Sequence, residues 1–295
     1  MAEQPYAIEM RGITKTFGSV VANKDVNLTL KKGEILALLG ENGSGKTTLM
    51  NMLSGIYAPD KGEILVDGKP AQISSPEDAK RLGIGMVHQH FKLVEVFSAA
   101  DNIWMGRSKT GLALKRDRYQ EVADTAKRFG FDLDPRKKVE SMAVSEKQTL
   151  EIIKVLYYGA KVIILDEPTA GLDPVGVASI LGNIHDYHTA KNATIIIVSH
   201  SMEEVARTVD RLVGINDGRI PFSGAPREVF AHGDELEAMG LGVPAMTRVF
   251  HRLRAMGVDI DPSVYTTEQA RDAVLAKLAR AGQQKQSASG ERGAV

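Results

Sequence analysis

Short apolar runs bounded by polar residues recur along the chain and predict the strands of a sheet. Residues Val26–Leu30 alternate apolar and polar side chains, which is typical of a strand with one buried face. Three other runs show no alternation and predict strands buried on both faces, as in a parallel sheet: Ile35–Leu39, Val162–Leu165 and Ile195–Val198. Polar residues and then a helical pattern follow each of these three runs, the order expected of βα units. The pattern therefore predicts an α/β fold.

Two α/β portions, about residues 1–89 and 159–235, are separated by a mostly helical stretch, about 90–158. Within this stretch the apolar spacing predicts helices at Arg118–Phe129 and Glu146–Tyr157. The helical stretch is therefore expected to form an insert between the two parts of the sheet domain.

A further segment, about 236–281, carries helical patterns at Ala245–Ala255 and Thr267–Arg280. Apolar residues spaced three and four positions apart favour packing on the chain's own core over contact with a second copy: Met246, Val249, Phe250 and Leu253. The end of the chain, 282–295, has no apolar periodicity, and we expect it to be disordered.

The composition narrows the class of protein. Of 295 residues, 37 are Lys or Arg and 37 are Asp or Glu, so the chain lacks the basic excess of a nucleic-acid binder. The lack of cysteine excludes a disulfide framework, a thiolate zinc site and a cysteine nucleophile. The longest apolar runs fall far short of the roughly 20 residues of a membrane span, and Met1–Pro5 lacks the regions of an export signal. These features predict a cytosolic chain that reaches a membrane only through a partner.

One glycine-rich segment carries specific chemistry. Gly40–Thr47 fits the pattern G-x-x-x-x-G-K-[ST] and lies between a buried strand and a helical pattern starting near Lys46. In that context the glycines turn backbone N–H groups toward phosphate oxygens beside a helix N-terminus. Lys46 would reach the β- and γ-phosphates, and the Thr47 hydroxyl would bind Mg²⁺. The predicted nucleotide-binding residues are Gly40, Glu41, Asn42, Gly43, Ser44, Gly45, Lys46, Thr47 and Thr48.

Two carboxylates follow the buried run Val162–Leu165, at the strand end where ligands bind in open α/β sheets. Asp166 suits a magnesium-holding role, and Glu167 would polarise the water that attacks the γ-phosphate. An Asp-Glu-Pro sequence can also simply end a strand at a turn. The phosphate loop in the same chain favours the catalytic interpretation.

Two further polar residues end predicted strands. His200 follows the run Thr194–Ser199 and begins a helical pattern through residue 204; a parallel sheet would bring it beside the phosphate loop as a donor to the γ-phosphate. Gln89 follows Ile84–Val87 and would sense Mg²⁺ or the attacking water. Taken singly, a histidine at a strand end is more often structural, and Gln89 carries little weight.

Together these motifs resemble the ATP-binding cassette of ABC transporters, over about residues 6–235. The resemblance implies an α/β fold with a P-loop NTPase (RecA-like) core, a mostly parallel sheet, an antiparallel β portion, the helical insert and a C-terminal helical appendix. It implies that ATP and Mg²⁺ bind between two cassettes, and that hydrolysis moves membrane-spanning partners. The family roles fall on Phe17 (stacking on adenine), Gly40–Thr48 (Walker A), Gln89 (Q-loop), Asp166 and Glu167 (Walker B and catalytic base), Asp173 (D-loop) and His200 (switch histidine).

The resemblance is mixed along the chain. Met86–Phe91 and its surroundings look like the importers of simple sugars and purine nucleosides. From about Asp166 onward the chain looks like the ATPases of energy-coupling-factor importers, most clearly in Pro168–Pro174 and Glu235–Pro244. A recombined or designed chain is one hypothesis that these two halves motivate.

The family's signature motif is altered in this chain. Its LSGGQ position is occupied by Met142–Glu146, in which Ala143 replaces the serine and Ser145 a glycine. In the family this motif holds the γ-phosphate bound on the opposite cassette, and Ala143 cannot donate the hydroxyl hydrogen bond. We expect weak hydrolysis in a homodimer, or pairing with a different cassette that has an intact signature. The alternative is that backbone amides and the helix N-terminus suffice.

The resemblance predicts the ATPase subunit of an importer, peripheral at the cytoplasmic face of the membrane. Its expected partners are a transmembrane permease, a second cassette and a substrate-binding component, with no nucleic acid. The helical insert is expected to contact the permease near Gln89 and Phe91–Val94. The alternatives are a regulatory cassette that hydrolyses poorly and a soluble ABC protein without a transport role. A P-loop kinase or GTPase is disfavoured by Glu167, by His200 and by the lack of an Asn-Lys-x-Asp guanine motif.

Overall fold

The computed structural model describes residues 5–105, 117–202 and 206–290, with side chains to residue 280. Its strands form two sheets, a six-stranded sheet of order β10-β9-β3-β8-β7-β6 and a four-stranded sheet of order β2-β1-β4-β5. The strands are β1 (Tyr6–Phe17), β2 (Val20–Lys31), β3 (Ile35–Leu39), β4 (Lys61–Val66), β5 (Lys69–Pro70), β6 (Ile84–Val87), β7 (Val162–Asp166), β8 (Thr194–Ser199), β9 (Arg211–Asn216) and β10 (Arg219–Gly224).

The six-stranded sheet is parallel except at one edge. Strands β6, β7, β8, β3 and β9 pair in parallel, and β10 pairs with β9 in antiparallel fashion. All residues of β3, β7 and β8 are buried, which explains why these runs carry apolar residues without alternation. The three buried strands predicted from the sequence are confirmed.

The four-stranded sheet is antiparallel and begins with a long β1–β2 hairpin. The predicted strand Val26–Leu30 is the inner part of β2. No strand was predicted for β1, because its register shifts between Met10 and Ile13 and between Ile13 and Lys15 interrupt the alternation. This hairpin brings Phe17, at the end of β1, to the outer end of the sheet.

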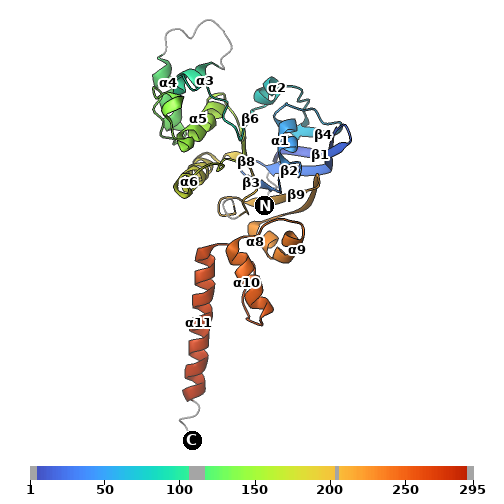
Figure 1. Cartoon of the computed structure of the whole chain (residues 1–295), viewed down its shortest axis with the longest axis vertical. Coiled ribbons are helices and arrows are strands. Elements are labelled where there is room, and N and C mark those ends of the chain that lie inside the picture. Colours follow the sequence, from blue (N-terminus) through green and yellow to red (C-terminus); the bar gives the residue numbers. More distant parts are fainter. Residues whose placement is uncertain (1–4, 106–116, 203–205, 291–295) are drawn as a thin grey trace.

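Two hydrophobic cores lie on the two faces of the six-stranded sheet. Ile35, Ala37 and Leu39 of β3 point into one core, while Leu36 and Leu38 point into the other. The first core takes in the helices of the insert and α6 (Pro174–Lys191), and the second takes in α1 (Lys46–Leu53) and the antiparallel sheet. Figure 1 shows this division, with α3 to α6 on one side and α1, β1, β2 and β4 on the other.

The insert contains helices α3 (Ala99–Trp104), α4 (Arg118–Arg128) and α5 (Val144–Tyr157), with a short 3-10 helix at Val139–Ser141. The predicted helices Arg118–Phe129 and Glu146–Tyr157 are confirmed as α4 and α5. Helix α3 was not predicted, since it is only six residues long; the Ser98 hydroxyl caps it by accepting from the Asp101 N–H at 3.2 Å. In the chain, helix α2 (Pro76–Arg81) follows β5 of the antiparallel sheet and precedes β6 of the six-stranded sheet.

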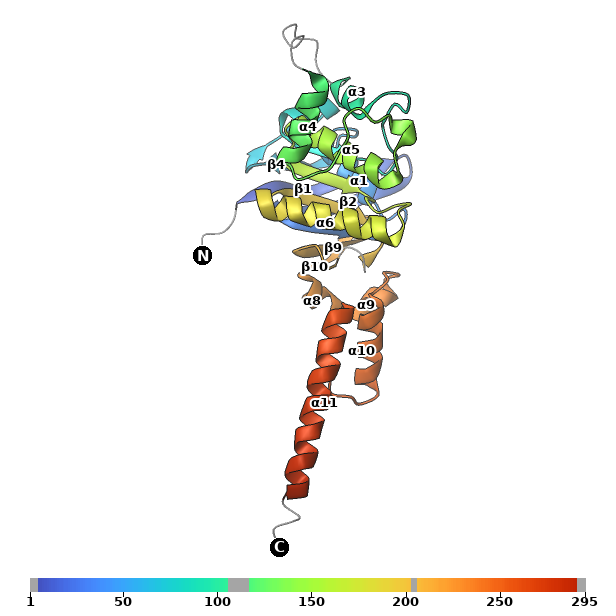
Figure 2. The same cartoon turned by 90° about the vertical axis from the view of Figure 1, so that its left-hand side faces the viewer.

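The C-terminal segment forms α8 (Pro226–Phe230), α9 (Gly233–Ala238), α10 (Ala245–Ala255) and α11 (Thr267–Gly290). In both views α10 and α11 lie side by side and point away from the sheets (Figures 1 and 2). Phe250 is buried against Val264 and Ala270, with Met246 packed on the same cluster, whereas Val249 is exposed. The apolar residues of α10 thus pack mainly within the appendix.

Helix α11 differs from the expectation for the end of the chain. A disordered tail was predicted from residue 282, but the helix continues to Gly290. The absence of apolar periodicity excludes burial of a helix face, not helix formation, and Ala, Gln and Lys in this stretch are good helix formers. Residues 282–290 are thus helical in backbone, and the expected disorder of the tail stays a prediction. Residues 291–295, and Glu203 and Glu204 of the helical pattern expected after His200, lie outside the described residues.

Among residues 5–105, 117–202 and 206–290, no helix combines the length and the apolar character that crossing a bilayer requires.

Candidate functional site

The predicted phosphate loop connects β3 to α1 and is held tightly between strands. Gly43 and Gly45 have φ of 83° and 105°, the region that favours glycine. A Cβ atom at Gly45 would lie 2.4 Å from the Ala22 carbonyl oxygen, and one at Gly40 would lie 2.4 Å from that of Ile215. Side chains at these two positions would force the loop away from β2 and β9. Gly40 and Gly45 are therefore required by the close approach of the loop to these strands.

Lys46 begins α1 and turns back over the loop. Its Nζ donates to the carbonyl oxygens of Gly40 at 2.8 Å and Glu41 at 2.9 Å. Burial lowers the pKa of Lys46, and the carboxylates of Glu167, Asp166 and Glu41 oppose that effect. The ammonium group is thus held inside the loop, where bound phosphate oxygens would replace the two carbonyl partners.

Asp166 ends β7 and lies beneath the phosphate loop. Burial, followed by the charge of Glu167, raises its pKa to about 6, while Lys46 and a hydrogen bond from the Thr47 hydroxyl act in the opposite direction. Its Oδ1 is buried without a hydrogen-bond partner in the described part of the chain. An unsatisfied buried carboxylate oxygen beside a threonine hydroxyl fits a magnesium site, because Mg²⁺ is bound by a few oxygen ligands and waters.

Glu167 and His200 meet at the ends of β7 and β8. The Glu167 Oε2 lies 2.9 Å from Nδ1 of His200, and the carboxylate is largely buried while the imidazole is exposed. Glu167 has a positive φ of 50°, and its N–H donates to the Val198 carbonyl at 2.9 Å. This hydrogen bond ties the residue after β7 to the end of β8, next to His200.

Lys46, Glu167 and His200 line one cavity of about 620 Å³. Its apolar end is formed by Phe17, Val20, Val21 and Ala22, and its polar end by the loop, with Gln89 also at the wall. The sequence did not indicate Val20, Val21 and Ala22, at the start of β2, or Asp217 and Gly218, in the turn between β9 and β10. Of the predicted residues, the cavity brings together Phe17, Asn42, Gly43, Gly45, Lys46, Thr47, Thr48, Gln89, Glu167 and His200.

The sequence pattern of the ABC transporter family matches residues 23–170, half of the chain. The chain belongs to this family. Its fold agrees with that of cbiO1 from Clostridium perfringens, described as part of the ABC transporter complex cbiONQ, with a TM-score of 0.70 and 30% identity over 85% of this chain and 99% of that one. The predicted family and α/β P-loop fold are confirmed.

Two curated relatives are import proteins. The nucleoside import ATP-binding protein NupA of Lactococcus lactis is 43% identical over 215 residues, which is 72% of this chain and 42% of that protein. The guanosine import ATP-binding protein NupO of Bacillus subtilis is 49% identical over 178 residues, 60% of this chain and 35% of that protein. The chain thus spans less than half of the length of either relative.

Seven predicted residues are not among the lining of this cavity: Gly40, Glu41, Ser44 and Asp166, in or beside the phosphate loop, and Ala143, Ser145 and Asp173, at the starts of two helices. Ala143 is the N-cap of α5, and its N–H donates to the Glu146 carboxylate at 2.8 Å. Asp173 is the N-cap of α6, where its carboxylate accepts from the Gly176 N–H at 2.7 Å. Ser145 is in the first turn of α5. These three residues lie at helix N-termini, outside the lining of this cavity.

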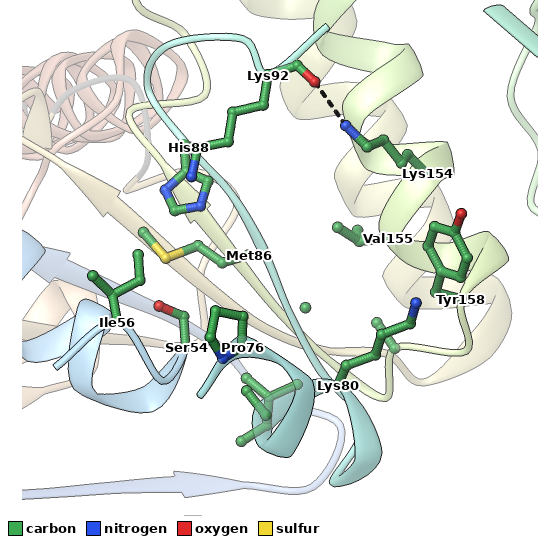
Figure 3. A pocket seen from close by; sticks show the side chains of 14 residues that line it. Ser54, Ile56, Pro76, Lys80, Met86, His88, Lys92, Lys154, Val155 and Tyr158 are labelled. Carbon is green, nitrogen blue, oxygen red and sulfur yellow. Dashed lines mark hydrogen bonds between the residues drawn. The ribbon is translucent and has the colours of Figure 1, made fainter. Parts of the chain in front are cut away.

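A second cavity of the cassette, about 320 Å³, lies between the sheet domain and α5 (Figure 3). Its apolar wall includes Ile56, Met86 and Val155. The cationic side chains around it come from α2, the segment after β6 and α5: Lys80, Lys92 and Lys154. Figure 3 shows Lys154, whose Nζ donates to the Lys92 carbonyl at 2.9 Å, and Lys80, whose Nζ lies 3.5 Å from the Tyr158 ring centre.

His88, directly before Gln89 in the chain, lines this second cavity, which is hereafter called the groove. Burial lowers its pKa to about 4, and the charges of Lys92 and Lys154 add to the effect. The imidazole is therefore neutral at neutral pH, and the positive charge of the groove comes from its lysines. The groove combines an apolar wall with a cationic rim.

Proposed function

We propose that the chain is the ATP-binding and ATP-hydrolysing subunit of an importer. Its nucleotide site would be the first cavity, whose lining includes Phe17, Lys46 and His200. The observation that carries this proposal is that one cavity brings three kinds of group together. An apolar wall at Phe17, a phosphate-binding loop around Lys46 and a carboxylate at Glu167 match the base, phosphates and attacked phosphorus of ATP. The import relatives support a role in uptake.

The phosphate loop would bind and orient the nucleotide. Backbone N–H groups of Gly43–Thr48 and the ammonium of Lys46 would hold the β- and γ-phosphates, while Phe17 would stack on the base. Thr47 and Asp166 would hold Mg²⁺, with Gln89 as a further candidate ligand. A bound Mg²⁺ would neutralise charge on the phosphate oxygens.

Glu167 would act as the general base for hydrolysis. Its carboxylate would accept a proton from the attacking water as the water adds to the γ-phosphorus and the bond to ADP breaks. His200, hydrogen-bonded to Glu167, would donate to the γ-phosphate and keep the carboxylate oriented. Gln89 would help to position the water.

A second cassette would complete the site. Ala143, Ser145 and Asp173 lie away from this chain's cavity, so we assign them to the nucleotide of a partner cassette, as the family resemblance implies. The partner would be a second copy or a different cassette. Ala143 favours the second arrangement, because it carries no hydroxyl for the γ-phosphate.

A membrane permease would dock at the groove of Figure 3, beside Gln89 and Phe91–Val94. A short apolar segment bearing a carboxylate fits the apolar wall and cationic rim. The chain would then be peripheral at the cytoplasmic face of the membrane, with a substrate-binding component outside. By likeness to the import relatives, nucleosides or simple sugars are the proposed cargo.

A poorly hydrolysing regulatory cassette is the second candidate, and Ala143 is the observation in its favour. Reconstitution of the chain with a permease from the same operon tests both. Substrate-stimulated MgATP turnover that stops in the Glu167→Gln variant supports the transport ATPase. Nucleotide binding without turnover in the complete complex supports the regulatory cassette.

A further inference from the structure

Phe17 occupies a position that its own hairpin does not fix. It is the last residue of β1 and pairs with Val20 across the β1–β2 turn. Its side chain is 43% exposed and belongs to neither of the two large cores. An exposed ring at a hairpin tip has several rotamers open to it, and binding a base would require ordering it. The structure supplies two contacts that restrict this freedom.

The first contact is aromatic. The rings of Phe17 and Tyr57 meet edge to face, with centroids 5.1 Å apart and planes at 72°. This arrangement is the one that aromatic pairs favour, and it leaves a face of Phe17 free of Tyr57. Tyr57 follows the end of α1, where its N–H donates to the Asn51 carbonyl at 3.2 Å. The tyrosine is thus anchored to the helix that begins at Lys46.

The second contact fixes the backbone just before Phe17. Oδ2 of Asp60 accepts from both the N–H and the hydroxyl of Thr16, each at 2.7 Å. Oδ1 accepts from Nζ of Lys15 at 2.8 Å, and the Asp60 N–H donates to the Thr14 carbonyl at 2.9 Å. The Asp60 carboxylate therefore accepts three hydrogen bonds from Lys15 and Thr16 at the end of β1.

These hydrogen bonds favour the ionised form of the Asp60 carboxyl. Hydrogen bonds from Lys15 and then Thr16 lower its pKa to about 2. The Lys15 ammonium also lies 5.5 Å from the centre of the Phe17 ring. Asp60 therefore orders both the backbone and a cation next to the ring.

We propose that Tyr57 and Asp60 are positioning residues that hold Phe17 as the stacking wall for the nucleotide base. Both lie within a few residues of the end of α1, and the start of that helix carries the phosphate-binding Lys46, Thr47 and Thr48. One element thus sets the distance between the base end and the phosphate end of the cavity. This inference rests on the proposed function, namely that Phe17 faces the base.

The test compares two ligands that differ in having a base. Isothermal titration calorimetry measures the affinity of the full chain for the magnesium complexes of a non-hydrolysable ATP analogue and of inorganic tripolyphosphate. Tyr57→Ala and Asp60→Asn should each lower the affinity for the ATP analogue by about two- to ten-fold, the range of an aromatic pair or a side-chain contact. Tripolyphosphate affinity should be unchanged, which also shows that the variants are folded.

Two further variants make the comparison specific. Tyr57→Phe keeps the ring and should restore the affinity for the ATP analogue. Asp67→Asn removes an exposed ion pair, to Lys32 at 2.7 Å, in the turn between β4 and β5 and outside the cavity lining, and should change neither affinity. In turnover assays the Tyr57→Ala and Asp60→Asn variants should raise KM for ATP and leave kcat at saturating ATP unchanged.

The Phe17→Ala variant separates failure of the inference from failure of the proposed site. It should lower the affinity for the ATP analogue by about five-fold or more, since stacking of a base on an aromatic ring contributes at least ~1 kcal/mol. If Phe17→Ala has this effect and Tyr57→Ala and Asp60→Asn do not, the positioning role is wrong. If Phe17→Ala has no effect, the proposed base contact is wrong. Equal losses for tripolyphosphate would overturn the positioning role, because the residues would then act on the fold as a whole.

Discussion

The carboxylate of Glu167 and the imidazole of His200 lie 2.9 Å apart, although 33 residues separate them in the chain. They meet because β7 and β8 are parallel neighbours whose carboxyl ends reach the same edge of the sheet. Glu167 is 9% exposed in its side chain and His200 is 63% exposed. A largely protected carboxylate beside an accessible imidazole is the arrangement on which the proposed hydrolysis depends.

Glu167→Gln should abolish steady-state hydrolysis while MgATP binding persists. Loss of a general base typically lowers a rate by about 10²–10⁴-fold, and the amide keeps the shape of the side chain. With hydrolysis stopped, the chain should accumulate as an ATP-bound dimer, seen by size exclusion with light scattering. Glu63→Gln, at a half-exposed glutamate of β4, is the control and should leave turnover unchanged. Wild-type turnover in Glu167→Gln would contradict the assignment, and a chain that stays monomeric in saturating MgATP would contradict a homodimer.

Ala143→Ser should raise the ATPase rate of the dimer by about ten-fold or more, because a hydrogen bond to a charged acceptor contributes roughly 1.5–3 kcal/mol. The same change should also stabilise the free chain, since a serine N-cap of α5 would accept a backbone N–H, worth ~1 kcal/mol. Assays of turnover and thermal unfolding separate the two effects.

The structure offers a matched control for this substitution. Ala225 is the N-cap of α8, and its N–H also donates to a glutamate three residues on, Glu228 at 3.0 Å. Ala225→Ser should therefore stabilise the fold to a similar extent without any gain in turnover. An unchanged rate in Ala143→Ser, or an equal gain in Ala225→Ser, would contradict the hypothesis that Ala143 in the altered signature motif weakens hydrolysis.

The sequence predicted those parts of the site that are encoded locally. The loop at Lys46 and the carboxylate pair at Asp166 each follow a fully buried strand, so a few neighbouring residues define both strand and site. The contacts of Phe17 could not be predicted in the same way. Tyr57 and Asp60 reach it through the pairing of β1 with β4, whose bulges hide the alternation. Long-range pairing of this kind leaves no periodic pattern in a single sequence.

Lys92→Glu should weaken association with the permease about ten-fold, because reversing a rim charge mainly lowers the rate of association. Lys92 is exposed at the groove of Figure 3. Its N–H donates to the Glu151 carboxylate at 2.8 Å, and the other oxygen of that carboxylate pairs with Lys154 at 3.4 Å. Co-purification of the reconstituted complex at low and moderate salt measures the effect, which salt should reduce in the wild type. Lys127→Glu, on the exposed surface of α4, makes the same charge change elsewhere and should bind normally. Equal binding of the two variants would exclude the groove as the docking site.

The Asp60 carboxyl should titrate near pH 2, below the value of about 3.9 for an unfolded aspartate. A pKa lowered in the folded state means that Asp60 stabilises the fold above about pH 4 and that this contribution is lost as the pH falls through about 2. The free energy of unfolding, from urea titrations, should thus differ between wild type and Asp60→Asn by a constant amount at pH 5–7 and by less at pH 3.

Carbon-13 NMR of the carboxyl gives the pKa directly. Lys15→Met, which removes the largest cause of the shift, should move that pKa upward; an Asp60 pKa near 3.9 in the wild type would show that the carboxylate does not hold the end of β1 as described.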